Sequence, residues 1–126
     1  MTWPTDWADE IRAHYAQLAE EWGWDPDIVA AVTASAEHIR DLASQDRPRR
    51  YFAGDFDNEQ YYFETVEDCG SLVVLRQIVV GRDGHTHRYW WGRIEDGFGG
   101  LSESAIDPRE GPPASGAEVF ARAWQF

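Results

Sequence analysis

Lysine is absent from the 126 residues of this chain, and cysteine occurs only once. All eleven basic residues are therefore arginine. Together with frequent alanine, glycine, aspartate and tryptophan, this bias indicates a GC-rich bacterial genome rather than a functional requirement. The lone Cys69 cannot form an internal disulfide, which is typical of proteins from the reducing cytoplasm.

Long apolar segments are also missing. No apolar run approaches the ~20 residues that span a bilayer. The amino terminus, MTWPTDWADE, has neither the positive charge nor the apolar core of a signal peptide. We therefore expect a cytoplasmic protein.

Positive charge is scarce, because 23 acidic residues outnumber 11 basic ones and the net charge is −12. Phosphate backbones and anionic lipids repel a protein of this charge, so nucleic-acid binding and membrane binding are disfavoured. A basic protein partner would be attracted instead. The alternative is that the acidic charge only keeps the protein soluble.

Apolar and aromatic residues are abundant, at 43% and 14% of the chain. This composition supports a packed core, and the length suits a single domain over residues 1–126. Residues 1–45 are predicted to form a helical hairpin, with the first helix over residues 5–23, because apolar residues recur three or four positions apart. This apolar stripe consists of Trp7, Ile11, Tyr15, Leu18 and Trp22.

The second helix has a strong start signal in Asp25 and Pro26, which suit the N-cap and the first helical position. It is expected to run to about Ser44. Its inward-facing residues are expected to be Ile28, Val32, Ile39 and Leu42.

Residues 49–105 contain runs of β-branched and aromatic residues, which predict an antiparallel meander. Its four runs are RYFAGDF, EQYYFETV, SLVVLRQIVV and HTHRYWWGRIE. The turns between them are expected at Asp57-Asn58, at Glu67-Asp68-Cys69-Gly70 and at Asp83-Gly84. A fifth, short strand is placed within residues 100–105.

The carboxyl end is predicted to form a closing helix over residues 115–124, with Ser115 and Glu118 spaced as a capping box. Its apolar face would consist of Val119, Phe120 and Trp124. The predicted fold class is therefore α+β, with an N-terminal helical hairpin, an antiparallel meander of four to five strands and a short C-terminal helix.

The register of the last hairpin follows from its turn. With Asp83-Gly84 as a two-residue turn, Val80 pairs with His87 and the final strand continues to Glu95. Both faces of this hairpin then carry large apolar groups. Either helices cover both faces, or one face exposes an aromatic patch.

Two histidines on the last strand raise the question of a metal site. His85 and His87 point to the same side, but a site needs a third protein ligand. The positions at which cupin barrels have a glutamate are Trp91 and Gly92 here. The stretch at residues 55–60, DFDNEQ, lacks the glycine and the glutamate of a calcium loop. We therefore expect no stoichiometric metal and no cofactor.

Catalytic motifs are missing as well, since no nucleophile elbow and no phosphate-binding glycine loop occurs. Cys69 lies in the acidic turn VEDCGS, where neighbouring carboxylates disfavour a thiolate. Glu64 lies mid-strand among aromatic residues, where a carboxylate either serves as a general acid or base or simply faces solvent. No catalytic residue is assigned, and the sequence favours a non-enzymatic protein.

The part of the chain from RYFAGDF to ARAW resembles the small bacterial immunity proteins of polymorphic toxin systems. The likeness is carried by RQIVVGRDG, by the loop GLSESAIDP and by the terminal EVFARAW. It covers roughly 70 residues and implies a meander with a closing helix and an acidic binding face. The function that the resemblance implies is a stoichiometric inhibitor that blocks the active site of a toxin.

A second interpretation belongs to a different class of protein. Helices followed by strands also suit a small enzyme or ligand-binding protein of the nuclear-transport-factor-like cone shape, with an aromatic-lined pocket. The residues that favour this interpretation are Tyr61, Tyr62, Phe63, Trp90 and Trp91. A third interpretation is an interaction or scaffold domain without a toxin.

Our central hypothesis from the sequence is that the protein binds another protein, most simply a toxin domain with a basic active-site surface. Aromatic residues and arginine supply binding energy at interfaces, while charges set the encounter rate. The anchors would be Tyr89, Trp90, Trp91 and Arg93. The acidic field would come from Asp55, Asp57, Glu59, Glu67 and Asp68. In the alternative, the aromatic residues are all buried and the carboxylates only solvate loops.

Overall fold

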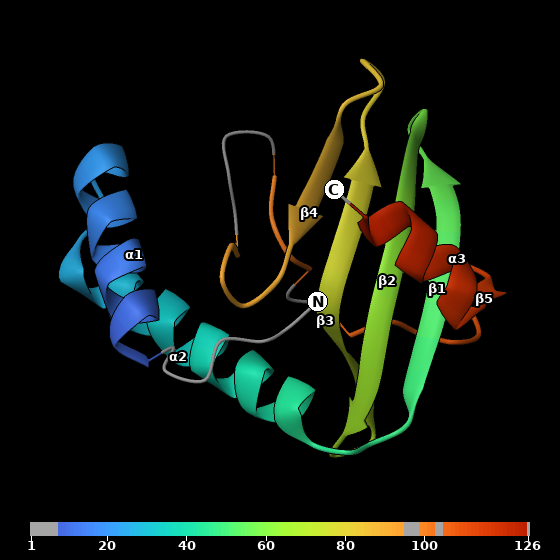
Figure 1. The fold of residues 1–126 in the computed structure, drawn as a ribbon, viewed down its shortest axis with the longest axis horizontal. Coiled ribbons are helices and arrows are strands. Elements are labelled where there is room, and N and C mark those ends of the chain that lie inside the picture. The colour runs from blue at the N-terminus through green and yellow to red at the C-terminus, as the bar shows by residue number, and fades with distance from the viewer. Residues whose placement is uncertain (1–7, 95–98, 103–104, 126) are drawn as a thin grey trace.

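Two consecutive helices form the amino-terminal part of the structure, with α2 running from α1 towards the sheet (Figure 1). The computed structural model describes residues 8–94, 99–102 and 105–125. Helix α1 is Ala8–Trp22 and helix α2 is Pro26–Ser44, so both predicted helices are confirmed. Trp7 and the side chain of Ile11, which the apolar pattern also assigned to the first helix, lie outside this description. Among the described residues, no helix combines the length and the apolar character that a membrane crossing requires.

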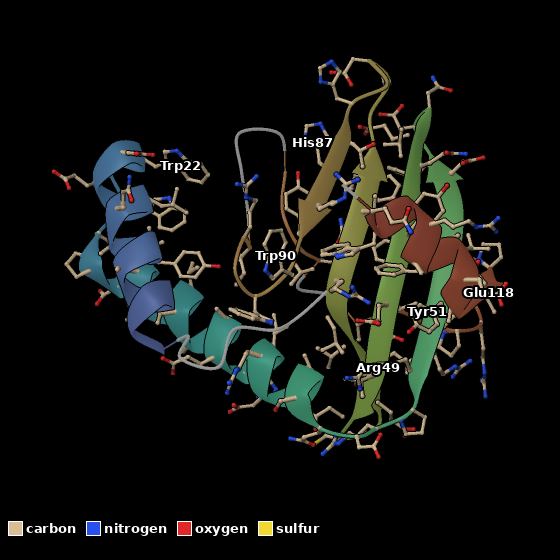
Figure 2. The ribbon with its side chains drawn as sticks, viewed as in Figure 1. Trp22, Arg49, Tyr51, His87, Trp90 and Glu118 are labelled. Carbon is tan, nitrogen blue, oxygen red and sulfur yellow. The ribbon has the colours of Figure 1, made fainter. Side chains whose placement is uncertain are left out.

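The predicted start of α2 is confirmed, because Oδ1 of Asp25 accepts a 3.0 Å hydrogen bond from the Ile28 amide. Fewer apolar residues of the two helices are buried than the sequence predicted. Tyr15 and Leu42 are buried, but Trp22 and Ile28 are 39% and 43% exposed. Trp22 lies at the outer end of α1 and Ile28 in the first turn of α2, where the sheet does not reach (Figure 2). Partly buried are Leu18, Val32 and Ile39.

The five strands form one sheet in the order β4-β3-β2-β1-β5, and every pair is antiparallel. They are β1 Arg49–Phe56, β2 Glu59–Asp68, β3 Ser71–Val80, β4 Thr86–Tyr89 and β5 Ala114–Ser115. The predicted α+β fold is therefore confirmed. The fifth strand is β5, which pairs with β1. Of residues 100–105, where a short strand was predicted, the structure describes 100–102 and 105, and none of these belongs to a strand.

Two of the turns contain two residues with positive φ angles, as tight hairpins require. These residues are Asp57 and Asn58 between β1 and β2, and Cys69 and Gly70 between β2 and β3. The first turn was predicted correctly. The second is shorter than predicted, because pairing continues through Glu67 and Asp68 to Ser71.

The predicted register of the last hairpin is wrong by one residue. Its loop contains three residues, Arg82 to Gly84, because the Gly81 amide bonds to the His85 carbonyl and Gly84 adopts a φ of 81°. His87 consequently pairs with Val79 instead of Val80. A slip of one residue moves each side chain of the strand to the opposite face of the sheet.

The last long strand is also shorter than predicted, because β4 ends at Tyr89. The chain then turns back on itself, with hydrogen bonds in both directions between the backbones of Trp90 and Arg93. Tyr89 is therefore the last residue of β4 to pair with β3, opposite Gln77.

Gly92 is required in this turn. A Cβ atom at this position would lie 2.5 Å from Nε1 of Trp90, whose ring is held edge-on against Trp124 with centroids 5.7 Å apart. We expect Gly92→Ala to lower the free energy of unfolding, measured by urea denaturation, by about 1–3 kcal/mol. Gly99→Ala is the control, because its added methyl would stand 3.5 Å from Oη of Tyr89, an ordinary contact. Equal losses in the two variants would contradict this explanation.

Other elements cover both faces of the sheet in part, which accounts for the two-sided apolar pattern. Helix α3, Ala117–Trp124, packs Phe120 and Trp124 onto Ile78 (Figure 1). The opposite face has a core of Phe52, Phe63, Leu72, Val74, Val79, Tyr89 and Leu101.

The closing helix exists, but its predicted start is wrong. Ser115 belongs to β5, and Gly116 occupies the N-cap position without a side-chain hydrogen bond. There is therefore no capping box with Glu118. The apolar face is confirmed for Phe120 and Trp124, whereas Val119 is 37% exposed.

Candidate functional site

The five turn carboxylates do not form one surface. Asp55, Asp57 and Glu59 flank the turn between β1 and β2. Glu67 and Asp68 end β2, whose 10 residues place them about 30 Å from Glu59 at the other end of the sheet. The predicted acidic field is therefore divided between two ends.

The carboxylates at the β2–β3 end are partly neutralised by the protein itself. Oδ1 of Asp68 lies 3.4 Å from Nη1 of Arg47, and Oδ2 lies 3.5 Å from Nε2 of His38. Arg47 also donates to the Glu67 carbonyl at 3.0 Å. These contacts tie the end of α2 to the sheet, which is a structural role.

Two of the four predicted aromatic and arginine anchors belong to the core. Tyr89 is 0% and Trp91 is 3% exposed. The carbonyl of Trp91 accepts a 2.8 Å hydrogen bond from the buried Tyr15 hydroxyl, so this residue anchors α1 instead of a partner. Trp90 is half-buried and Arg93 is exposed. Tyr89 and Trp91 are therefore unavailable to a partner, and their prediction as surface anchors is wrong.

A groove lies beside the β1–β2 turn, and we call it the tip groove. It has a volume of about 560 Å³. Its walls are Gly54, Asp55, Phe56, Tyr61, Phe63, Glu110, Gly111, Pro112 and Pro113. It thus unites two hairpin strands with a segment some fifty positions later in the chain.

The close approach of that later segment accounts for the glycine in β1. A Cβ atom on Gly54 would stand 3.1 Å from Cβ of Pro112, so a larger residue would push the segment away. The Ala53 amide also donates a 3.0 Å hydrogen bond to the carbonyl of Pro113. These contacts hold the proline wall of the tip groove in place.

The floor of the tip groove is aromatic. The rings of Tyr61 and Phe63 are stacked, with centroids 6.0 Å apart and an interplanar angle of 12°. Phe56 is 73% exposed, more than any other large hydrophobic residue described. Phe56, Tyr61 and Phe63 line the same groove, and a contiguous apolar patch, unlike a single exposed side chain, marks an interaction surface.

The electrostatic environment of the tip groove is negative. Asp55 and Glu110 line it, and no arginine or histidine is among its lining residues. The Tyr61 hydroxyl donates to Oε1 of Glu59 at 3.4 Å. Burial raises the pKa of Tyr61, and the charges of Glu59 and Asp57 raise it further. The tip groove is thus suited to a positively charged group.

Asp57 is the one carboxylate at this end that has an arginine partner among the described residues. Nη2 of Arg82 lies 2.5 Å from its Oδ2, and Nε of Arg82 donates to its backbone carbonyl at 2.9 Å. Both side chains are more than half exposed, at 64% and 58%. A pair this exposed contributes little to stability, about 0–1 kcal/mol.

Tyr51 and Tyr61 give the protein a predictable weakness at high pH. Burial and a nearby carboxylate raise both pKa values above the ordinary 10.0. The folded state therefore holds these protons more tightly than the unfolded state. Their contribution to stability is complete below about pH 10 and is lost as pH rises through the higher folded values. We expect the urea midpoint to fall above about pH 10, and to fall less in a Tyr51→Phe/Tyr61→Phe variant. Identical alkaline profiles would refute this.

Glu64 neither faces solvent nor stands ready as a general acid or base. Its two carboxylate oxygens accept hydrogen bonds of 2.8 Å from Nε and Nη2 of Arg76, and Oε2 also accepts one of 3.0 Å from Tyr51. The Arg76 guanidinium lies 4.8 Å from the ring centroids of both Phe120 and Trp124. Figure 2 shows Tyr51 beside α3. This cluster, which we call the Glu64–Arg76 cluster, fastens α3 to the sheet.

The histidines and the cysteine do not assemble a reactive site in the described structure. His85 is exposed at the β3–β4 turn, and His87 lies on β4 (Figure 2). Residues 8–94, 99–102 and 105–125 contain no group of three or more His, Cys, Asp or Glu residues that could hold a metal ion. Cys69 is exposed in its turn.

A second hollow of about 440 Å³ is lined by residues of α2 and β3. Its lining is mainly aliphatic, with polar groups from Ser35, His38 and Ser102. The five aromatic residues expected to line a single pocket are dispersed. Tyr61 and Phe63 line the tip groove, Tyr62 and Trp90 pack near α3, and Trp91 packs against α1 and α2.

Comparisons with protein-family models, curated proteins and solved structures found no match to this chain. The functional inference therefore depends on the chemistry of the site. Sequence reasoning identified Asp55, Asp57 and Glu59 but missed Phe56 and Glu110. The alternation of β2 indicated that Tyr61 and Phe63 share a face, but no local signal placed residues 110–113 beside them.

Proposed function

We propose that this protein is a non-catalytic inhibitor that binds a basic surface of another protein, as an immunity protein does when it blocks the active site of a bacterial toxin. The observation that carries the proposal is the tip groove, where the highly exposed Phe56 lies between Asp55 and Asp57. An apolar anchor beside an excess of charge of one sign is the arrangement that interfaces use for affinity and for steering.

The net charge of −12 supports the same proposal. A basic active-site surface, such as that of a nuclease, would be drawn towards the acidic end of the sheet before contact. Inhibition then requires only stable coverage of the toxin's active site. We place this activity in the cytoplasm, where a lone cysteine such as Cys69 stays reduced.

Growth protection tests this function. The coding sequence adjacent to this one in its genome would be expressed in a bacterial host, alone and together with this protein. We expect the adjacent product to stop growth and co-expression to restore it. A harmless neighbour, or a toxic one against which this protein gives no protection, would contradict the proposal.

A second candidate function is the binding of a small apolar molecule, and the hollow between α2 and β3 favours it. Its volume of about 440 Å³ lies within the roughly 300–1,000 Å³ of ligand pockets. Titration with octanoate should then shift the methyl NMR signals of Val32, Ile39 and Val74, and Ser35→Leu should abolish the shifts. Unchanged methyl signals would exclude octanoate-like ligands.

A further inference from the structure

The tip groove combines two kinds of wall that suit one kind of side chain. Phe56, Tyr61 and Phe63 offer aromatic rings. Glu59, which shares the Tyr61 face of β2 and accepts a hydrogen bond from the Tyr61 hydroxyl, and Glu110 offer carboxylates. Neither of these two carboxylates forms an ion pair with any residue that the structure describes. A ligand with an apolar stem and a cationic head would satisfy both walls at once.

The protein already binds arginine in this way inside its own fold. In the Glu64–Arg76 cluster, the guanidinium of Arg76 lies 4.8 Å from two ring centroids and is held by one carboxylate. Arg50 likewise lies 5.5 Å from the ring centroid of Phe52. The tip groove presents rings and carboxylates of the same kinds, but its lining contains no arginine.

We infer that the tip groove receives an arginine side chain of the partner protein, with the guanidinium against the Phe56 and Tyr61 rings and hydrogen-bonded to Glu59 and Glu110. Arginine is favoured over lysine because its planar group both stacks on rings and bonds carboxylates in pairs. The inference rests on the proposed function, since it names the chemistry that the acidic end recognises.

The volume of the tip groove indicates what accompanies that arginine. About 560 Å³ is the size of a cleft for a drug-sized ligand, so neighbouring residues of the partner segment would enter with the arginine. The far wall contains Pro112 and Pro113, whose rings restrict the backbone. The close approach of Pro112 to Gly54 keeps that wall near β1. A preformed groove of this kind loses little entropy when it is filled.

Three short peptides test the inference without knowledge of the partner. Each is an acetylated, amidated pentapeptide of glycine and alanine with arginine, lysine or citrulline at its centre, titrated into the labelled protein and followed by NMR. We expect the arginine peptide to shift the signals of Phe56, Glu59, Tyr61 and Glu110. We also expect it to bind about fivefold more tightly than the citrulline peptide, which has the same shape but no charge.

Variants assign the binding to the two walls. Glu59→Gln/Glu110→Gln should reduce the affinity for the arginine peptide to that for citrulline, and Phe56→Ala should reduce it about threefold. Glu20→Gln/Asp46→Asn changes the net charge equally on exposed residues outside the tip groove and should leave the affinity unchanged. Circular dichroism would show that each variant keeps its fold. Equal binding of the arginine and citrulline peptides, or shifts outside the tip groove, would overturn the inference.

The outcomes separate this inference from the proposed function. Growth protection with no arginine-specific binding would support the proposed inhibitor function and contradict the arginine site. Arginine-specific binding at the tip groove without growth protection would support the arginine site and contradict the inhibitor function.

Discussion

Glu64→Gln is expected to lower the free energy of unfolding by about 2–4 kcal/mol, because it removes the carboxylate that accepts two hydrogen bonds from the charged and mostly buried Arg76 guanidinium. The two side chains are 6% and 17% exposed, so water replaces little of the lost interaction. The loss should also loosen α3, since Arg76 lies against the rings of Phe120 and Trp124. Urea denaturation with tryptophan fluorescence would measure both effects.

A double-variant cycle provides the control. Glu64→Met/Arg76→Met removes both charges and retains apolar volume. Its loss of unfolding free energy should therefore be smaller than the sum of the losses in Glu64→Met and Arg76→Met. Asp57→Asn breaks the exposed pair with Arg82 and should cost less than about 1 kcal/mol. A Glu64→Gln protein as stable as the wild type would show that the Glu64–Arg76 cluster does not hold the fold together.

The second large effect is expected in the rate of association with the toxin. Replacing three carboxylates at the tip, as Asp55→Asn/Asp57→Asn/Glu59→Gln, should lower the association rate constant about tenfold at low salt, because steering charges act on the encounter. The turn should survive, since asparagine tolerates the φ of 54° that Asp57 adopts. Stopped-flow fluorescence would give the rate.

The matched control is Glu20→Gln/Asp41→Asn/Asp46→Asn, which removes the same charge from exposed positions on and after the helices. Its association rate should stay within about twofold of the wild type, because these charges lie away from the tip and salt screens them. The wild-type rate should itself fall as salt rises from ~0.05 to ~0.5 M, since the Debye length shrinks about threefold. Equal rates for the two triple variants would show that net charge alone matters.

Features with a local cause were predictable from the sequence. Asp25 and Pro26 located the start of α2 because a cap and the first turn are set by adjacent residues. Asp57 and Asn58 gave the β1–β2 turn for the same reason, since both adopt positive φ. The α+β class followed from the change of apolar period after α2.

Features that depend on distant contacts were not predictable. The register of β4 depends on whether the loop before it contains two residues or three. The sequence Arg82-Asp83-Gly84 is compatible with both loop lengths. The burial of Glu64 depends on α3, which lies more than fifty residues later. No local pattern shows that α1 and α2 cover Trp91, so the prediction of a surface anchor at this residue is wrong.

The most direct test of the central claim is hydrogen exchange of this protein, free and bound to the toxin domain. We expect slower amide exchange in the complex at residues 54–61 and at Glu110 and Gly111, which belong to the two segments that form the tip groove. Protection confined to α1 and α2, or to the opposite end of the sheet at residues 67–70, would contradict it.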